Sequence, residues 1–142
     1  MPFNHQLTKE SFNHIGKNCL PGLLGIVITE LKENCIAAEI EITNSHFAPN
    51  GYIHAAAVVA LADTTAGYGC IAHLPENGKS FTTIELKSNF LSSAKTGTMI
   101  CEAIPLHLGK TTQLWDVTVK HKETHKTMAL FRCTQLIIYN KP

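Results

Sequence analysis

The chain lacks the features that mark secreted, membrane-spanning and nucleic-acid-binding proteins. Its start has no basic segment followed by an apolar stretch, so we expect no signal peptide. No apolar run approaches the roughly 20 residues that a membrane span needs. The net charge is only +1 with the histidines neutral, and the lysines are scattered along the chain. These absences predict a cytoplasmic protein without a nucleic-acid or membrane partner.

The chain also lacks paired cysteines and metal-type ligand spacings. Its five cysteines are odd in number and widely spaced, and none forms a Cys-x-x-Cys pair. This pattern is typical of reduced, mostly buried thiols in a cytoplasmic protein. The histidines show no spacing that indicates a metal site. We therefore predict neither a metal nor a cofactor.

The bulk composition predicts an ordinary folded domain. Hydrophobic residues make up 44% of the 142 residues, which is enough for a core and too many for a disordered chain. No internal repeat, low-complexity tract or linker divides the sequence. We therefore treat residues 1–142 as a single domain.

The N-terminal part of the chain predicts a short helix and a hairpin. Residues 7–17 form the helix, and Pro21 and Gly22 break the chain after it. Residues 24–31 and 35–43 form two strands joined by a polar turn. The second strand alternates apolar and polar side chains, which indicates one buried face and one wet face.

Residues 54–72 differ in composition from the segments before them, because they include seven alanines. Small apolar side chains suit a helix pressed close to a sheet, where bulky ones would hold the surfaces apart. Further strands are predicted at residues 80–91, 98–108, 110–122 and 127–139. We expect Trp115 and Phe90 in the core. The order of elements predicts an α+β fold, with an antiparallel sheet wrapped around one long central α-helix.

The strongest functional signal is the segment PNGYIHAAAVVALADTTAGYG at residues 49–69. In it, Gly51 precedes His54 by three positions, and Asp63 follows His54 by nine. This spacing resembles that of hotdog-fold acyl-CoA thioesterases of the phenylacetate-pathway (PaaI-like) type. In that family an asparagine-containing loop, a glycine and two residues lead to a His-Gly-Gly that opens the central helix. An acidic residue follows nine positions after the histidine.

Two later segments extend the resemblance. One is TIELKSNF at residues 83–90, followed by a glycine at position 97, and the other is Gly109-Lys110-Thr111. The resemblance covers residues 36–139 with all elements in order. It implies a hotdog fold and hydrolysis of an acyl-CoA to a free carboxylic acid and CoA, without a cofactor. It also implies a homodimer as the active unit, commonly as a dimer of dimers, that is, a homotetramer.

The sequence departs from the family pattern at two places. The His-Gly-Gly becomes His54-Ala55-Ala56, and the usual loop asparagine is replaced by Ala48. Asn50 lies two residues further on and is the candidate to replace it. The backbone donor offered by the first glycine survives in Ala55, because only proline lacks an N–H. What is lost is conformational freedom, together with space beside the thioester.

Thioester hydrolysis needs an activated nucleophile and a stabilised oxyanion. The unpaired N–H groups at a helix start offer an oxyanion site, and Ala55 N–H, together with Ala56, is the candidate donor. The resemblance makes Asp63 the catalytic carboxylate, acting either as general base or as nucleophile. Thr83 is a candidate to orient water or Asp63, and we expect His54 to position the helix start.

Helix geometry predicts that the site is shared between subunits. Nine residues correspond to about 900° of rotation and about 13 Å along the axis, so positions 54 and 63 lie on opposite faces. One thioester carbonyl group therefore cannot contact both the Ala55 N–H and the Asp63 carboxylate of the same chain. We predict that Asp63 and Thr83 of one subunit act with His54, Ala55 and Asn50 of the other.

Recognition of the CoA moiety is predicted at Gly109, Lys110 and Asn89, with Lys110 facing a phosphate. The acyl group is left open, although the alanines at the helix start disfavour bulky aromatic thioesters there. The alternative function is a catalytically weak or inactive acyl-CoA-binding hotdog protein. A hotdog hydratase is disfavoured because nothing in the sequence matches its catalytic arrangement.

Overall fold

A computed structural model describes residues 2–141 of the chain. Its elements follow one another as α1 (Lys9–Gly16), α2 (Leu20–Leu24), β1 (Val27–Lys32), β2 (Cys35–Glu41), η1 (Asn44–His46), α3 (Ala55–Ala72), β3 (Gly78–Phe90), β4 (Thr98–Leu108), β5 (Thr112–His121) and β6 (Thr127–Tyr139). The predicted strands at residues 98–108 and 127–139 coincide with β4 and β6. The predicted central helix begins one residue later than expected.

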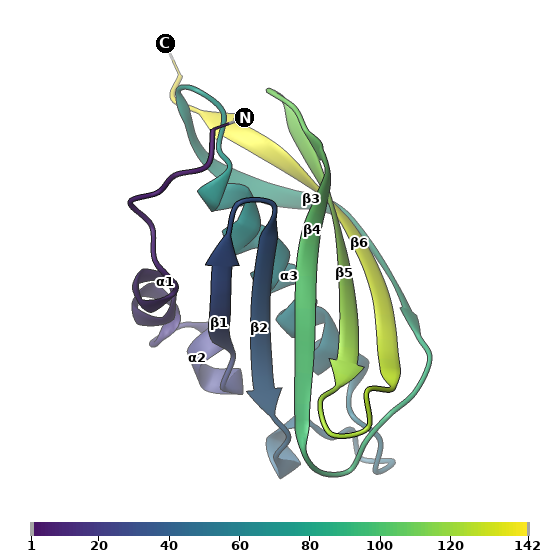
Figure 1. The fold of residues 1–142 in the computed structure, drawn as a ribbon. Helices are drawn as coiled ribbons and strands as arrows, with labels where there is room; N and C mark the ends of the chain where they lie inside the picture. The colour runs from purple at the N-terminus through teal and green to yellow at the C-terminus, as the bar shows by residue number, and fades with distance from the viewer. Residues whose placement is uncertain (1, 142) are drawn as a thin grey trace.

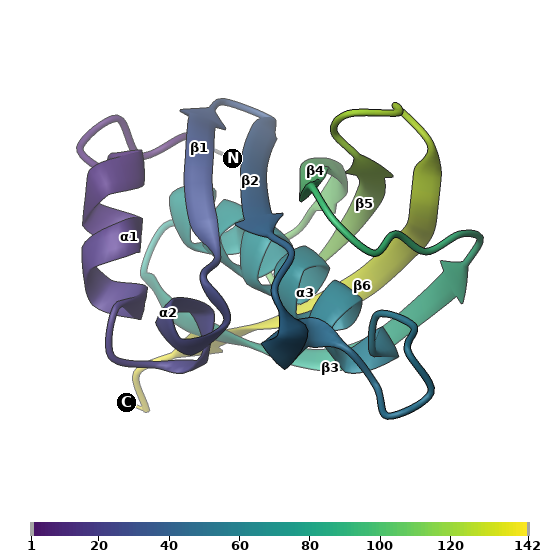
Figure 2. The same cartoon turned by 90° about the horizontal axis from the view of Figure 1, so that it is seen from below.

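The strands form one antiparallel sheet in the order β1-β2-β4-β5-β6-β3. The sheet curves around α3, which lies in its concave face (Figure 1). Viewed from below, α3 is surrounded by the sheet on several sides, while α1 and α2 lie beside β1 (Figure 2). The α+β prediction of a sheet wrapped around a central helix is therefore confirmed.

The small residues of α3 allow it to approach the sheet closely. A Cβ placed on Gly69 would lie 2.7 Å from ring atoms of Trp115, and one placed on Gly67 would lie 2.6 Å from the Phe81 ring. Trp115 is fully buried, as predicted. Larger side chains on this helix would force the sheet away, which explains its alanine and glycine content.

By length and composition alone, α3 could cross a membrane, since its 18 residues have a mean hydropathy of 1.4. More than half of this helix is buried inside the protein. Its apolar character is therefore explained by the core that it forms with the sheet. The cytoplasmic location and the absence of a membrane partner stay predictions.

The region before β1 differs from the prediction. Pro21 and Gly22 lie inside the short helix α2 instead of breaking the chain, because proline is tolerated in the first turn of a helix. Gly25, with a φ of 77°, ends α2 in the left-handed conformation. The strand predicted from residue 24 consequently begins only at Val27.

The prediction that Phe90 lies in the core is wrong. A β-bulge interrupts the pairing of β3 with β6 between Thr83 and Glu85, so that Thr83 pairs with Gln135 while Glu85 pairs with Thr134. The extra residue shifts the alternation of side chains along the rest of the strand. Phe90 pairs with the buried Ala129, yet it is 48% exposed because it lies at the open end of the sheet.

Candidate active site

The start of α3 presents one free backbone donor. His54 is the N-cap, and its Nδ1 accepts a hydrogen bond from Ala56 N–H at 2.9 Å. The N–H of Ala57 donates to the His54 carbonyl, also at 2.9 Å. No hydrogen bond within residues 2–141 uses the N–H of Ala55. The expectation that Ala56 assists Ala55 as an oxyanion donor is therefore wrong, because His54 already occupies the Ala56 N–H.

His54 itself is arranged to position the helix rather than to transfer protons. Because Nδ1 accepts from Ala56, the neutral ring carries its proton on Nε2. The N–H of His54 donates to the His46 carbonyl at 2.8 Å, which ties the helix start to the preceding loop. The positioning role predicted for His54 agrees with this geometry.

His46 anchors that loop, and its role was missed in the sequence. It is 3% exposed; its Nδ1 accepts from Thr43 N–H at 2.9 Å, and its Nε2–H donates to the Leu24 carbonyl at 2.7 Å. Through these bonds it fixes the loop, including the carbonyl that holds His54. A histidine within a polar loop gave no signal of burial in the sequence.

An open groove of about 570 Å³ lies against the helix start. Its lining includes Asn50, His54 and Ala55 from the predicted site, together with Phe90 and Leu91 at the end of β3. Asn50 lies in a turn where its Oδ1 accepts from Tyr52 N–H at 3.2 Å. Three of the predicted residues therefore meet in one apolar groove, at the free end of a helix.

Asp63 lies in the middle of α3, outside that groove. Its Oδ1 accepts a hydrogen bond from the Thr83 hydroxyl at 3.0 Å, and the same hydroxyl lies 2.8 Å from Gln135 Oε1. Burial raises the pKa of the half-buried Asp63 carboxyl, and the Thr83 hydrogen bond opposes that rise. The predicted association of Asp63 with Thr83 is present. Desolvation makes this carboxylate a stronger base than one in water.

The bulge after Thr83 places it at this site. Thr83 and Phe81 both face α3, and the irregular residue between Thr83 and Glu85 then changes which side chains face the helix. Bulges occur frequently beside active sites, where they redirect a side chain. The pairing partner of Thr83 on β6 is Gln135, which is fully buried.

Gln135 was not predicted as a site residue, although the sequence carries a signal for it. Along β6, every second residue is buried, and Gln135 lies in this series with Ala129, Phe131, Cys133 and Ile137. A glutamine on an otherwise apolar strand face must find hydrogen-bond partners. One of those partners is Thr83.

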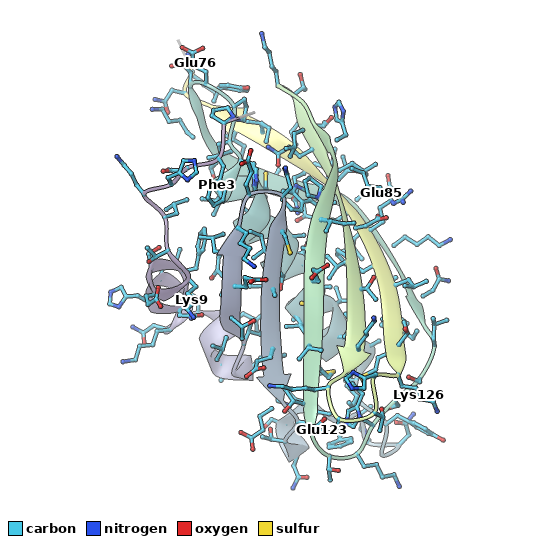
Figure 3. All side chains as sticks on the ribbon, in the orientation of Figure 1. Phe3, Lys9, Glu76, Glu85, Glu123 and Lys126 are labelled. Carbon is cyan, nitrogen blue, oxygen red and sulfur yellow. The ribbon has the colours of Figure 1, made fainter. Side chains whose placement is uncertain are left out.

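The residues predicted to bind CoA are not brought together within one chain. Lys110 lines an exposed groove with Glu76 and Tyr139, and Tyr139 donates its hydroxyl proton to the Lys110 carbonyl. Figure 3 shows Glu76 near the two chain ends, with Glu123 and Lys126 at the opposite end of the molecule.

The other two predicted CoA contacts lie on different parts of the surface. Asn89 lines a separate groove with Glu85, which Figure 3 labels at the right-hand side of the sheet. Gly109 forms the turn beside Lys110, and its N–H donates to the Thr112 carbonyl at 3.0 Å.

Within residues 2–141, no group of three or more histidine, cysteine, aspartate or glutamate side chains is placed to hold a metal ion. The cysteines described are all free thiols. The site therefore consists of two parts, a half-buried aspartate with its threonine and a free helix-start N–H beside an apolar groove. Together these are the parts that acyl transfer to water requires.

Comparison with known proteins identifies the family. The model of the "Thioesterase superfamily" matches residues 50–128, which is more than half of the chain. The chain belongs to this superfamily. The 1,4-dihydroxy-2-naphthoyl-CoA hydrolase of Listeria monocytogenes is 30% identical over 111 residues, covering 78% of this chain and 89% of that protein.

Solved structures of thioesterases share the fold. Thioesterase HI1161 from Haemophilus influenzae matches with a TM-score of 0.90 at 26% identity, covering 98% of this chain and 96% of that one. The PaaI protein of the E. coli phenylacetic acid degradation operon matches with a TM-score of 0.80 at 23% identity, covering 92% of each chain. The predicted PaaI-like hotdog thioesterase fold is confirmed, and the protein is a thioester hydrolase of this superfamily.

Proposed function

We propose that the protein hydrolyses acyl-CoA thioesters to a free carboxylic acid and CoA, at a site shared between two copies of the chain. Asp63 is the catalytic carboxylate, and Ala55 N–H is the oxyanion donor. Residues 1–142 act as one hotdog domain in this proposal. The observation that carries it is the half-buried Asp63, whose pKa is raised by burial and whose carboxylate accepts the Thr83 hydroxyl.

Two routes use the same carboxylate. As a general base, Asp63 takes a proton from water while the water oxygen bonds to the thioester carbon. As a nucleophile, its oxygen attacks that carbon to form a mixed anhydride, which water then hydrolyses. In both routes the carbon–sulfur bond breaks and the CoA thiolate leaves. Either route gains from a carboxylate that has lost part of its solvation.

The oxyanion donor is the first N–H of α3. Charge that develops on the thioester oxygen is stabilised there by the free Ala55 N–H and by the positive end of the helix dipole. His54 supports this donor indirectly, because it binds Ala56 N–H and so defines the start of the helix. Asn50 lies in the same groove and is a candidate contact for the thioester.

The surface of β3 supports a shared site. This 13-residue strand is an edge of the sheet, since β6 lies on only one side of it. It carries the exposed apolar side chains of Ile84, Leu86 and Phe90. The Ser88 hydroxyl is buried without a hydrogen-bond partner in the described part of the chain. A long, apolar edge strand favours pairing with a second copy, and a pair of such dimers would give the homotetramer.

A second copy across β3 completes the chemistry. The groove at the helix start contains neither Asp63 nor Thr83, so one chain holds the two halves of the site in separate places. In a two-fold dimer, residues of one chain meet different residues of the other in both directions. Asp63 and Thr83 of one copy would then face His54, Ala55 and Asn50 of its partner. Contacts from Lys110, Gly109 and Asn89 to CoA remain part of this proposal.

Release of free CoA thiol from a panel of acyl-CoAs, in the wild type and in Asp63→Asn, tests the reaction. We expect activity that falls by about 10³-fold in the variant, because the carboxylate is lost while the fold is kept. Acyl-CoA binding without turnover in the wild type would instead favour the alternative of an inactive acyl-CoA-binding protein.

Mixing two inactive variants tests the shared site. Asp63→Asn lacks the carboxylate, and Ala55→Pro lacks the helix-start N–H. If each site takes one part from each chain, every mixed dimer holds one intact site. About half of randomly mixed dimers are of this kind, so about a quarter of the wild-type activity should return. No recovery, with mixed dimers demonstrated by mass spectrometry, would show that each site lies within one chain.

A further inference from the structure

A row of polar side chains crosses the concave face of the sheet beneath α3. Thr83 on β3 pairs with Gln135 on β6, and Gln135 pairs with Gln113 on β5. Both glutamines are fully buried. Gln113 is accounted for by the fold, since its Nε2 donates to the His73 carbonyl at 2.7 Å and its Oε1 accepts from Trp115 Nε1 at 3.0 Å. Gln135 instead faces Thr83, which contacts Asp63.

The Thr83 hydroxyl faces two hydrogen-bond acceptors but has only one hydrogen to donate. Its hydroxyl lies 3.0 Å from Asp63 Oδ1 and 2.8 Å from Gln135 Oε1, and both of these atoms are acceptors. A hydroxyl has one hydrogen and can donate one full hydrogen bond. A half-turn of the Gln135 carboxamide exchanges its oxygen and nitrogen without changing the shape of the side chain. After that turn, Nε2–H donates to Thr83 Oγ1, and the Thr83 hydrogen is left for Asp63.

We propose that Gln135 is a positioning residue for Asp63, acting through Thr83, with its carboxamide nitrogen directed at the Thr83 hydroxyl. This assignment rests on the proposed function for the role of Asp63 in catalysis. The direction of the hydrogen bonds, however, can be tested without turnover. The chain of donors runs from Gln135 Nε2–H to Thr83 Oγ1, and from Thr83 O–H to Asp63 Oδ1.

The carboxamide atom of Gln135 that faces Cys133 is consistent with the same orientation. Gln135 Nε2 lies 3.3 Å from the sulfur of Cys133, and the half-turn places Oε1 there instead. Cys133 is buried, and burial raises the pKa of its thiol to about 12, so it keeps its S–H hydrogen. The thiol then donates to Oε1. Every bond in the series has one donor and one acceptor, which strengthens neighbouring bonds cooperatively.

This arrangement has a consequence for the reaction. With the Gln135 N–H directed at the Thr83 oxygen, the Thr83 hydrogen has no acceptor at Gln135, which favours its donation to Asp63. One carboxylate oxygen is thereby held, and the other is left to meet water or the thioester carbon. Holding a reacting group in this way raises the rate without any contact between Gln135 and the substrate.

The pKa of Asp63 can be measured directly, because the chain contains few aspartates. Asp63 and Asp116 are the only two aspartates in the chain. Asp116 forms a double hydrogen bond with Arg132 on the outer face of the sheet. Aspartate labelled with ¹³C at Cγ therefore gives two NMR signals, and the Asp63→Asn variant assigns them. A pH titration then follows the Asp63 pKa in the wild type and in variants.

Gln135→Met and Thr83→Val are the informative variants, because each removes polar atoms and keeps a similar volume. If Gln135 donates to Thr83, Gln135→Met weakens the bond to Asp63 and raises its pKa. Thr83→Val removes that bond and also raises the pKa. If Gln135 instead accepts the Thr83 hydrogen, Gln135→Met frees that hydrogen for Asp63 and lowers its pKa, which would overturn the proposal. Thr83→Val decides the question by the same signal if Gln135→Met fails to fold.

Gln113→Met is the matched control, since this buried glutamine lies in the same row without touching Thr83. It should lower stability and leave the Asp63 pKa unchanged. In kinetics, Gln135→Met should lower kcat/KM by about tenfold and move the acid limb of the pH profile to higher pH. An unchanged Asp63 pKa in Gln135→Met would refute the positioning role. Absence of acyl-CoA turnover in the wild type would refute only the proposed function.

Discussion

Replacing Ala55 by proline removes one hydrogen-bond donor from the proposed oxyanion site and little else. Ala55 is the first residue of α3, and its side chain is exposed. Proline is favoured at this helical position, where the N–H has no partner within the helix. The residue before a proline must be extended, and His54 already has φ −62° and ψ 132°. The perturbation is therefore confined to the N–H.

The size of the effect follows from how many donors the helix start offers. The Ala56 N–H is bound by His54 Nδ1, and the Ala57 N–H is bound by the His54 carbonyl. Ala55 therefore supplies the free backbone donor of this turn. Loss of one oxyanion donor typically costs about 10²–10³ in kcat, or about 2.7–4 kcal/mol. We expect this loss for Ala55→Pro, with a free energy of unfolding within about 0.5 kcal/mol of the wild type.

The assay is steady-state release of CoA thiol, with urea unfolding as the measure of stability. Ala55→Gly is the control, because it keeps the N–H and changes only the methyl group. It should retain kcat within about tenfold of the wild type. A proline variant that is folded and retains wild-type kcat would refute the assignment of Ala55 N–H as the oxyanion donor. The donor would then have to come from another part of the site.

Three further predictions concern pH and packing. Burial raises the pKa of Asp63, and its ionised form is the reactive one, so a pH–rate profile should show kcat/KM rising through that elevated pKa. His73 Nε2 accepts from Asn34 N–H at 3.0 Å, and burial lowers the pKa of His73 below its ordinary 6.5. Its contribution to the free energy of unfolding is thus complete above pH 6.5 and falls as the pH drops toward the folded pKa; His73→Gln should flatten this dependence in urea titrations. Gly69→Ala places a methyl 2.7 Å from the Trp115 ring and should cost about 1–3 kcal/mol; an unchanged urea midpoint would contradict it.

The regular parts of the fold were predictable because their periodicity is strong. Residues 98–108 and 127–139 alternate or run apolar between clear turns, and the observed strands have these bounds. The alanine-rich composition of residues 54–72 predicted a helix packed closely on a sheet. The structure has this close packing where Gly69 of the helix lies against the Trp115 ring of the sheet. Periodicity of this kind depends on local residues alone, so one sequence is enough to read it.

The errors arise where a single residue changes the register or where two segments meet. The bulge after Thr83 reverses the alternation along β3 and brings Phe90 onto the side that faces the helix. Phe90 lies at the end of the strand, however, so it lines the groove at the helix start instead of the core. The residues around this position do not predict a bulge. The engagement of Ala56 N–H by His54, and of Thr83 by Gln135, depends on side-chain directions that composition does not specify.

The alanines at the helix start bear on the choice of acyl group more than on the ability to hydrolyse a thioester. Among residues 2–141, the non-glycine residues with positive φ are Asn34, Asn77 and His125, so neither Ala55 nor Ala56 needs the conformational freedom of glycine. The donor survives in Ala55, and Ala55 lines the groove. Relative to a His-Gly-Gly start, the change is therefore two added methyl groups, one of which lies at the groove where the thioester is proposed to bind. A methyl group at this place narrows the space beside the thioester, and a difference of one methyl group in a pocket is enough to discriminate among substrates about 10- to 200-fold.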